Sequence, residues 1–200
     1  MDNYKTYKLF PSPVFHLKIE NYRELNLELK NYILNIKKKD SKGQKKSNYG
    51  GWHSHFFNQK DKPLEKFLKI IQKFIKKIII NEMGWKYNPD KVVIPVMWAI
   101  INKKGSFNIQ HNHPNSFLSA VYYVETPNNS GTINFFDPKE QKNIRYPEVE
   151  NFTELSAAVV NIEPQEGNLL VFPSYLYHSV NENLSDKERI IISFNVDIEK

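Results

Sequence analysis

Residues 107–124 read Phe-Asn-Ile-Gln-His-Asn-His-Pro-Asn-Ser-Phe-Leu-Ser-Ala-Val-Tyr-Tyr-Val, and this stretch decides the fold. Its two halves are rich in β-branched and aromatic residues, and a turn-forming His-Pro-Asn run separates them. Each half therefore predicts a strand, at 107–111 and 117–125. His111 and His113 stand at the end of the first strand. Because side chains two residues apart on a strand point to the same face, we expect both imidazoles to reach one point in space.

Similar short segments, bounded by glycine, proline and asparagine turns, continue on both sides of this stretch. About eight short strands with such turns are typical of a sandwich or barrel of the jelly-roll kind. The predicted fold class is mainly β with flanking helices: a double-stranded β-helix, the jelly-roll or cupin-like arrangement, with two N-terminal helices. The further predicted strands are residues 91–102, 131–136, 157–162, 168–172, 175–180 and 189–197.

The first part of the chain has a different pattern. Residues 13–20 alternate and predict one strand. Apolar residues at helical spacing predict a helix around 25–36 and a second helix at 62–83. Pro63 suits the first turn of the second helix, and Gly84 suits its C-terminal cap.

The length of 200 residues suits a single domain, which we expect to span 1–200. In this division residues 1–90 supply the N-terminal strand and helices, which pack on the sheet of a jelly-roll core at 91–200. The chain has no cysteine, which excludes disulfides, thiolate zinc sites and a cysteine nucleophile. It also has no apolar run of about 18 residues for a membrane span and no signal-peptide pattern. A cytoplasmic protein is expected.

The net charge of +6 is concentrated in one segment. Residues 37–46 hold six lysines and one aspartate. This clustering predicts a solvated lysine-rich loop, with a basic clamp on an anionic substrate as the alternative. A nucleic-acid binder that uses this loop is a further hypothesis, and it predicts binding that weakens steeply with salt.

A third histidine, His178, lies on a later predicted strand. Two close histidines and one distant one are how a jelly roll builds an open metal site, in which three protein ligands leave other positions free. His53 and His55 have the same spacing as the first pair, but no strand pattern flanks them. We interpret them as loop residues that can still line the mouth of a pocket.

Arg189 opens the apolar strand at 189–197, eleven residues after His178. An unpaired buried charge is costly, so this guanidinium needs a partner. A carboxylate fits it through two parallel hydrogen bonds. That carboxylate belongs either to an internal Asp or Glu or to a bound ligand, and the sequence leaves both open.

These residues resemble the motifs of the iron(II)- and 2-oxoglutarate-dependent oxygenases. In that superfamily a His-x-Asp/Glu pair, a distant His and an Arg about ten residues later mark the site. The run at 117–124 is similar to a prolyl hydroxylase strand in which the second of two tyrosines binds the cosubstrate. The resemblance is strongest at 98–195 and points to a family of oxygenases from bacteria and phages. Its members also open with a segment like the one at 9–14.

The resemblance implies Fe(II), 2-oxoglutarate as cosubstrate and O2, with decarboxylation of 2-oxoglutarate coupled to oxidation of a substrate, usually by hydroxylation. It implies metal ligands at His111, His113 and His178. It implies that Arg189 and Tyr123 hold the far carboxylate of 2-oxoglutarate, with Ser119 on the same strand face. The pocket residues that we expect from it are Trp98, Asn102, Tyr175 and Asn195, although core packing is the simpler interpretation of Trp98.

His113 stands where the family usually has Asp or Glu. Three interpretations compete: it is a true third ligand, it lies behind the ligands and water completes the site, or an acid such as Asp137 reaches the metal. An imidazole would leave the site one charge more positive than a carboxylate, which favours a dianionic cosubstrate.

Two other functions fit the same pattern. A cupin-like metal enzyme could use three histidines without 2-oxoglutarate, and a non-catalytic β-sandwich protein could carry a vestigial site. The substrate of an oxygenase could be a small molecule or a protein side chain. Nucleic acid is a weaker expectation, no membrane is expected, and the oligomeric state is open.

Overall fold

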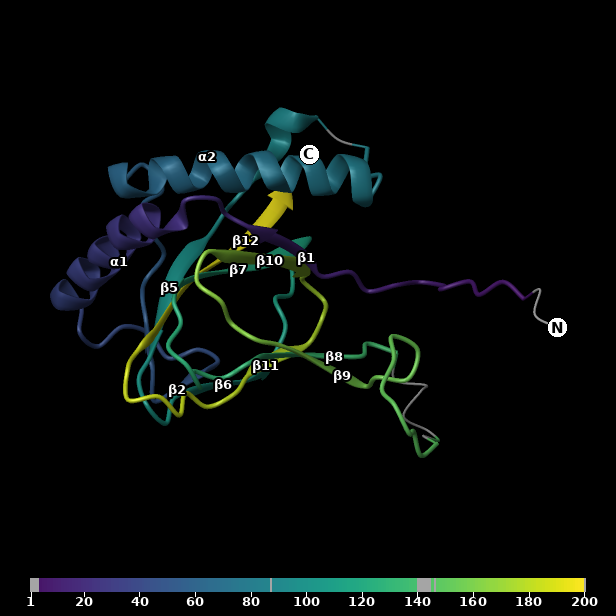
Figure 1. The fold of residues 1–200 in the computed structure, drawn as a ribbon. Coiled ribbons are helices and arrows are strands. Elements are labelled where there is room, and N and C mark those ends of the chain that lie inside the picture. The colour runs from purple at the N-terminus through teal and green to yellow at the C-terminus, as the bar shows by residue number, and fades with distance from the viewer. Residues whose placement is uncertain (1–3, 87, 140–144, 146, 200) are drawn as a thin grey trace.

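The computed structural model describes residues 4–86, 88–139, 145 and 147–199. Two antiparallel sheets face each other, a large one in the order β1-β10-β7-β12-β5-β3 and a small one in the order β2-β6-β11-β8-β9 (Figure 1). A further strand, β4, pairs with β12. Two facing antiparallel sheets with helices on one side confirm the predicted double-stranded β-helix.

The large sheet consists of β1 (Phe15–Lys18), β3 (Trp52–His53), β4 (Val92–Val93), β5 (Met97–Asn102), β7 (Leu118–Glu125), β10 (Asn168–Pro173) and β12 (Arg189–Ile198). The small sheet consists of β2 (Asn48–Tyr49), β6 (Phe107–His111), β8 (Ile133–Phe136), β9 (Val159–Ile162) and β11 (His178–Val180).

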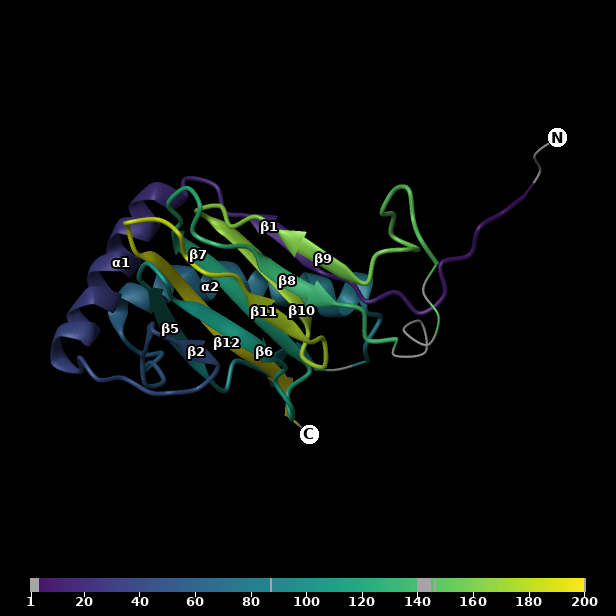
Figure 2. The same ribbon diagram turned by 90° about the horizontal axis from the view of Figure 1, so that it is seen from below.

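The helices cover the outer face of the large sheet. They are α1 (Tyr22–Lys39) and α2 (Lys62–Lys77), and α2 continues as a π-helical turn at Ile78–Glu82. A short 3-10 turn, Pro89–Lys91, precedes β4. Gly84 has a φ of 61°, the left-handed conformation in which glycine commonly follows a helix end. Figure 1 shows α2 lying across the sheet, and Figure 2 shows the small sheet on the opposite side.

Alternation along β12 separates the two faces of the large sheet. Its outward residues join the main apolar core with the buried faces of α1 and α2; these residues are Ile190, Ile192, Phe194 and Val196. Its inward residues face the small sheet; they are Arg189, Ile191, Ser193 and Asn195. Strand periodicity thus places the polar side chains of β12 in the space between the sheets.

Four sequence predictions need correction, three of them at the boundaries of an element. The predicted lysine-rich loop at 37–46 begins too early, because α1 extends to Lys39. Lysine is a good helix former, and a positive charge in the last turn complements the helix dipole. The predicted strand at 91–102 is interrupted at Pro95, which cannot donate to a ladder. The strand predicted at 175–180 begins only at His178, because Leu176 closes a turn onto Pro173.

The fourth correction concerns His53, which was interpreted as a loop residue. It lies in β3, where it pairs with Ile100 of β5. A strand of two residues is too short to show alternation, so the sequence gives no sign of it.

None of the helices in the described part of the chain has the length and hydropathy needed to cross a membrane.

Candidate metal centre and cosubstrate site

Three histidines converge between the two sheets. His111 ends β6, His178 begins β11, and the two residues are direct partners in the small sheet. His113 follows two residues after His111. One ligand nitrogen from each of the three lies within 4.8 Å of the others, and the ring centroids are 4.3 to 5.3 Å apart. Such a triad can hold a single metal ion on one face.

Backbone carbonyls orient two of the three rings. His111 Nδ1 lies 2.7 Å from the carbonyl oxygen of Ile109, and His178 Nδ1 lies 3.0 Å from that of Leu176. Since a carbonyl only accepts, each Nδ1 carries the proton, and each Nε2 is left bare for a metal. A ligating histidine usually has such a partner on its other nitrogen.

Burial keeps the three rings neutral. It lowers the pKa of His113 to about 4 and the pKa of His178 to about 3, with nearby His111 as a further cause. The pKa of His111 is also lowered by burial. At neutral pH all three are free bases, the form that binds a metal.

A network of polar side chains supports the turn that carries His113. The backbone N–H of His113 donates to the carbonyl of Ser174 at 3.0 Å. The Ser174 hydroxyl lies 2.8 Å from that of Ser119, which donates to Asn195 Oδ1 at 3.1 Å. These bonds tie the turn to β7 and β12 of the large sheet, so the backbone of the third histidine is held in place.

The cluster contains no carboxylate among the described residues. Asp137, which was considered as an acid that could reach the metal, lines a different cavity, beside Lys139 and Glu154. The geometry therefore favours His113 as the third ligand over an acid from elsewhere.

Arg189 is buried at the start of β12. Its Nη1 donates to the carbonyls of Ser130 and Gly131, the latter at 2.9 Å, while its Nη2 is buried without a hydrogen-bond partner. No Asp or Glu of the described residues forms an ion pair with it. Burial lowers the pKa of the guanidinium to about 10, which still leaves it charged at neutral pH.

Two hydroxyls accompany this unpaired cation. The pKa of Tyr123 is raised, chiefly by burial, and the positive charge of Arg189 opposes this rise. Ser130 Oγ is buried without a partner. Gly131 has a φ of 87° and lies very close to Asn181. A Cβ added at Gly131 would be 2.2 Å from the carbonyl oxygen of Asn181, so only glycine fits at this position. A buried cation with free donors beside it can accept the carboxylate of a ligand.

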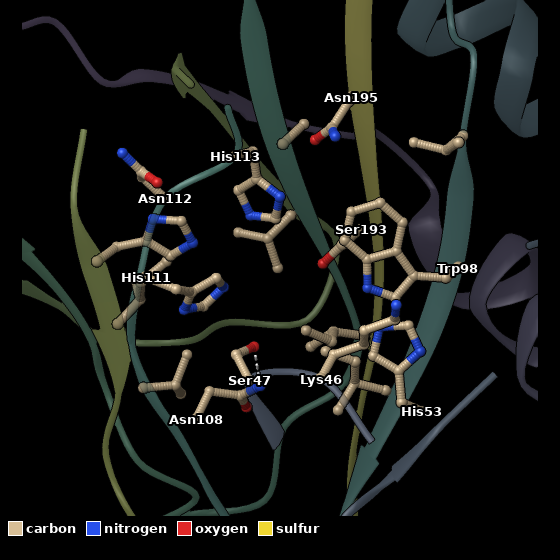
Figure 3. Close-up of a pocket in the computed structure, with 18 of the residues that line it drawn as sticks. Lys46, Ser47, His53, Trp98, Asn108, His111, Asn112, His113, Ser193 and Asn195 are labelled. Carbon is tan, nitrogen blue, oxygen red and sulfur yellow. Dashed lines mark hydrogen bonds between the residues drawn. The ribbon is translucent and has the colours of Figure 1, made fainter. Parts of the chain in front are cut away.

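A cavity of about 430 Å³ opens beside the histidines (Figure 3). Its walls include Val121 and Ile191. Tyr123 pairs with Ile191 across the two strands, and Arg189 lies two residues before Ile191 on the same face. Arg189 and Tyr123 do not themselves line the cavity.

The other predicted pocket residues divide into two groups. Trp98 and Asn195 line the cavity, so Trp98 faces the site as well as the core. Asn102 is buried and donates to Asn108 at 3.2 Å, and Tyr175 is 55% exposed; neither lines the cavity. Ser119 does not line it either, and its hydroxyl is already bonded on both sides.

The structure adds residues whose exact place in the site the sequence did not fix. Lys46, His53 and Ser193 line the cavity, and Ser130 lies against Arg189. Two signals in the sequence pointed toward them: the spacing of His53 and His55, and the lysine-rich segment at 37–46, which was considered as a basic clamp. His55 is mostly exposed and does not line the cavity.

Comparison with known families decides what this site belongs to. The profile of the family described as "Putative 2OG-Fe(II) oxygenase" matches residues 96–195, half of the chain. The chain belongs to this family. This oxygenase therefore uses iron(II) and 2-oxoglutarate, and its histidine triad and buried arginine lie within the matched region. No curated protein matches the sequence.

Solved structures agree on the fold of the oxygenase. A prolyl-4-hydroxylase from Pseudomonas putida superposes with a TM-score of 0.68 at 13% identity, over 94% of each chain. A Trichoplax adhaerens prolyl hydroxylase, solved with a hypoxia-inducible-factor peptide, gives 0.65 at 15% identity over 92% of this chain and 83% of that one. HygX from Streptomyces hygroscopicus, solved with nickel, 2-oxoglutarate and hygromycin B, gives 0.63 at 9% identity over 94% and 83%.

Proposed function

We propose that the oxygenase holds Fe(II) on His111, His113 and His178 and hydroxylates a substrate bound in the adjacent cavity. The observation that carries this assignment is the convergence of three neutral imidazoles beside a buried, unpaired guanidinium. Three nitrogen ligands on one face leave open positions, as non-haem iron oxygenases require.

The donor set fits the cosubstrate as well as the metal. The free Nη2 of Arg189, the Tyr123 hydroxyl and Ser130 Oγ would donate to the far carboxylate of 2-oxoglutarate. A buried donor without a partner is uncommon in a folded protein, so two such atoms, on residues that Arg189 Nη1 and the Ser130 carbonyl already join, point to a ligand that completes them. When bound, iron and 2-oxoglutarate supply the oxidising chemistry, and the protein orients them and excludes water.

We assign Ser119 to a supporting role instead of the cosubstrate contact that the resemblance implies. Its hydroxyl joins Ser174 to Asn195, and Ser174 holds the backbone of His113. Loss of this link would loosen the third metal ligand without touching the cosubstrate.

The substrate of this site is a small molecule or a single side chain of a peptide. A cavity of about 430 Å³ lies toward the small end of ordinary ligand sites, and it must also receive part of the cosubstrate. The fold accommodates both kinds of substrate, since one similar structure holds a peptide fragment and another holds hygromycin B. We also propose that the enzyme acts in the cytoplasm, where a reducing environment favours divalent iron.

The decisive experiment combines metal binding with turnover. Anaerobic titration with Fe(II) or Mn(II) should show one site per chain in the wild type and none in His178→Ala. Succinate formation from 2-oxoglutarate should follow the same order. His55→Ala is the matched control, because His55 is exposed and does not line the cavity. Absence of metal binding in the wild type, or equal binding by His178→Ala, would sink the proposal.

The role of His113 needs two further variants. If it is a ligand, His113→Ala should lower metal affinity by more than about 100-fold, beyond the roughly 10- to 100-fold loss typical of a residue behind the ligands. His113→Asp should restore affinity, because it recreates a carboxylate ligand at the same position. If His113→Ala binds metal like the wild type, His113 lies behind the ligands and water completes the site.

A further inference from the structure

Lys46 is the one cationic side chain of the cavity wall. Apart from histidines, the described residues that line the cavity include no other charged side chain and no carboxylate. The described part of the chain supplies no ion-pair partner for the Lys46 ammonium. Lys46 is still solvent-exposed, so the lysine-rich segment places one of its members at the open rim of the active-site cavity.

The backbone beneath Lys46 is fixed to the strand that carries His111. The N–H of Lys46 donates to Asn48 Oδ1 at 2.9 Å, and the next carbonyl, that of Ser47, accepts from Ile109 of β6 at 3.0 Å. Asn108 Nδ2 also donates to the Ser47 hydroxyl at 3.2 Å, as Figure 3 shows. Lys46 is therefore attached at a defined point of the cavity rim, unlike the neighbouring Lys45.

The wall next to Lys46 carries a buried hydrogen-bond donor without a partner. Figure 3 shows Lys46 on the side of the cavity that holds Trp98 and His53, opposite His111. Trp98 Nε1 is buried and has no hydrogen-bond partner. The His53 ring stacks on Trp98 with centroids 5.7 Å apart, and its Nδ1 donates to the carbonyl of Ser54 at 2.7 Å. An unsatisfied buried donor beside an unpaired cation is the arrangement expected for an oxyanion ligand.

The charge balance of the site leads to the same conclusion. The three ligand histidines are neutral, so a divalent ion and a dianionic cosubstrate cancel each other. The positive charges of Arg189 and Lys46 then remain, and the position that usually holds a carboxylate is His113. An anionic substrate would compensate a charge that no described residue of the cavity wall neutralises.

We propose that the substrate carries a carboxylate or phosphate group on an apolar body, with Lys46 pairing with the anion and Trp98 Nε1 donating to it. This assignment rests on the proposed oxygenase function. The apolar body would lie along the remaining wall, which includes Phe56, Ile100, Ile109, Ile133 and Val180. The anion would bind on the side away from His111, so that the carbon skeleton is presented to the metal.

The test measures binding of matched probes by calorimetry. The enzyme is first loaded with Mn(II) and N-oxalylglycine, an unreactive analogue of 2-oxoglutarate, which occupies the metal and Arg189. N-acetyl-leucine is then compared with its neutral amide, and hexyl phosphate with hexanol. Each anion that fits should bind about 10-fold or more tightly than its neutral counterpart, since hydrogen bonds to charged groups are among the stronger ones. Binding of only one anion supports the proposal and identifies the group as carboxylate or phosphate.

Variants connect the discrimination to the named residues. Lys46→Ala should abolish the preference for the anion and Lys46→Arg should retain it, while Lys45→Ala should behave as the wild type. Trp98→Phe keeps an aromatic ring and removes the donor, so it should weaken anion binding by about 5-fold. Equal binding of both acids and their neutral partners, or an unchanged preference in Lys46→Ala, overturns the proposal. Failure to load Mn(II) and the analogue instead overturns the proposed function.

Discussion

The same strands of the large sheet build two faces with opposite properties. On its outer face β7 carries residues that join the main apolar core, and even the one polar group there is satisfied, because Tyr122 donates to Asn26 Oδ1 at 2.6 Å. On the inner face, by contrast, the buried donors Arg189 Nη2 and Trp98 Nε1 have no hydrogen-bond partner. The outer face is complete without a ligand and the inner face is not. In natural proteins, buried polar groups without partners usually mark a site where a ligand binds.

The prediction with the largest expected effect concerns the stability that the outer face provides. Phe194→Ala should lower the free energy of unfolding by about 3–5 kcal/mol, because it leaves a cavity in a fully buried core beneath α2. Urea denaturation measures the change. The folded fraction should keep an unchanged KM for 2-oxoglutarate. The matched variant on the inner face, Ser193→Ala, should cost under about 1 kcal/mol. If Ser193→Ala lowered the free energy of unfolding as much as Phe194→Ala, the inner face would contribute to stability as the outer face does, which would contradict this comparison.

The next prediction tests the inner face. Arg189→Gln should raise the KM or Kd for 2-oxoglutarate by about 100-fold, the loss expected for charge-assisted hydrogen bonds. The free energy of unfolding should stay the same or rise, because the variant removes a buried charge without an ionic partner. Lys187→Gln, an exposed change in the preceding loop, is the control. Unchanged 2-oxoglutarate affinity in Arg189→Gln would favour a metal enzyme that uses no cosubstrate at this position.

The sequence could predict those features of the fold and the site that depend on local periodicity. The histidines at 111 and 113 share a strand end, and Arg189 stands at the start of an apolar run, so periodicity alone places these side chains on the inner face. The jelly-roll fold could be predicted for the same reason: its long strands each show alternation or a continuous apolar run. Two of the errors in the predicted strands, at Pro95 and at Leu176, lie where a proline or a turn interrupts an apolar pattern.

The residues that the sequence missed depend on contacts between distant segments. Lys46 reaches the cavity because Ser47 bonds to β6, and His53 reaches it because β3 pairs with β5. Ser130 is identified only by its contact with Arg189, 59 residues away. For Ser119 the sequence predicted the correct strand face, but it did not predict that the hydroxyl would bind Ser174. Periodicity gives the direction of a side chain and does not give its neighbour.

The third prediction concerns pH and the neutral histidines of the inner face. In the unfolded chain a histidine titrates near 6.5, whereas burial lowers the pKa of His113 to about 4 and that of His178 to about 3. Between these values the unfolded state binds protons that the folded state does not, so stability falls as pH decreases from 7 toward 4. At pH 5 each of the two should cost about 2 kcal/mol relative to pH 7.5.

Urea denaturation in the presence of a metal chelator, at pH 7.5 and at pH 5.0, measures this difference. His178→Asn should reduce the loss by about 2 kcal/mol, since it removes one of the histidines that burial keeps neutral. His55→Asn, at a histidine outside the cluster and the cavity wall, is the matched control. A wild-type protein that is equally stable at both pH values would show that the imidazoles are not held neutral by burial.

The smallest effect gives the sharpest comparison, because it uses two adjacent tyrosines on opposite faces of β7. Tyr123→Phe removes a donor to the cosubstrate carboxylate, so the KM for 2-oxoglutarate should rise about 5-fold, which corresponds to roughly 1 kcal/mol. Tyr122→Phe removes the hydrogen bond to Asn26, so it should lower the free energy of unfolding by about 1 kcal/mol and leave the KM unchanged. Steady-state succinate formation and urea denaturation, measured on both variants, give a two-by-two result. If Tyr122→Phe changes the KM as much as Tyr123→Phe does, cosubstrate binding depends on the packing of the whole strand, and the two faces do not act independently.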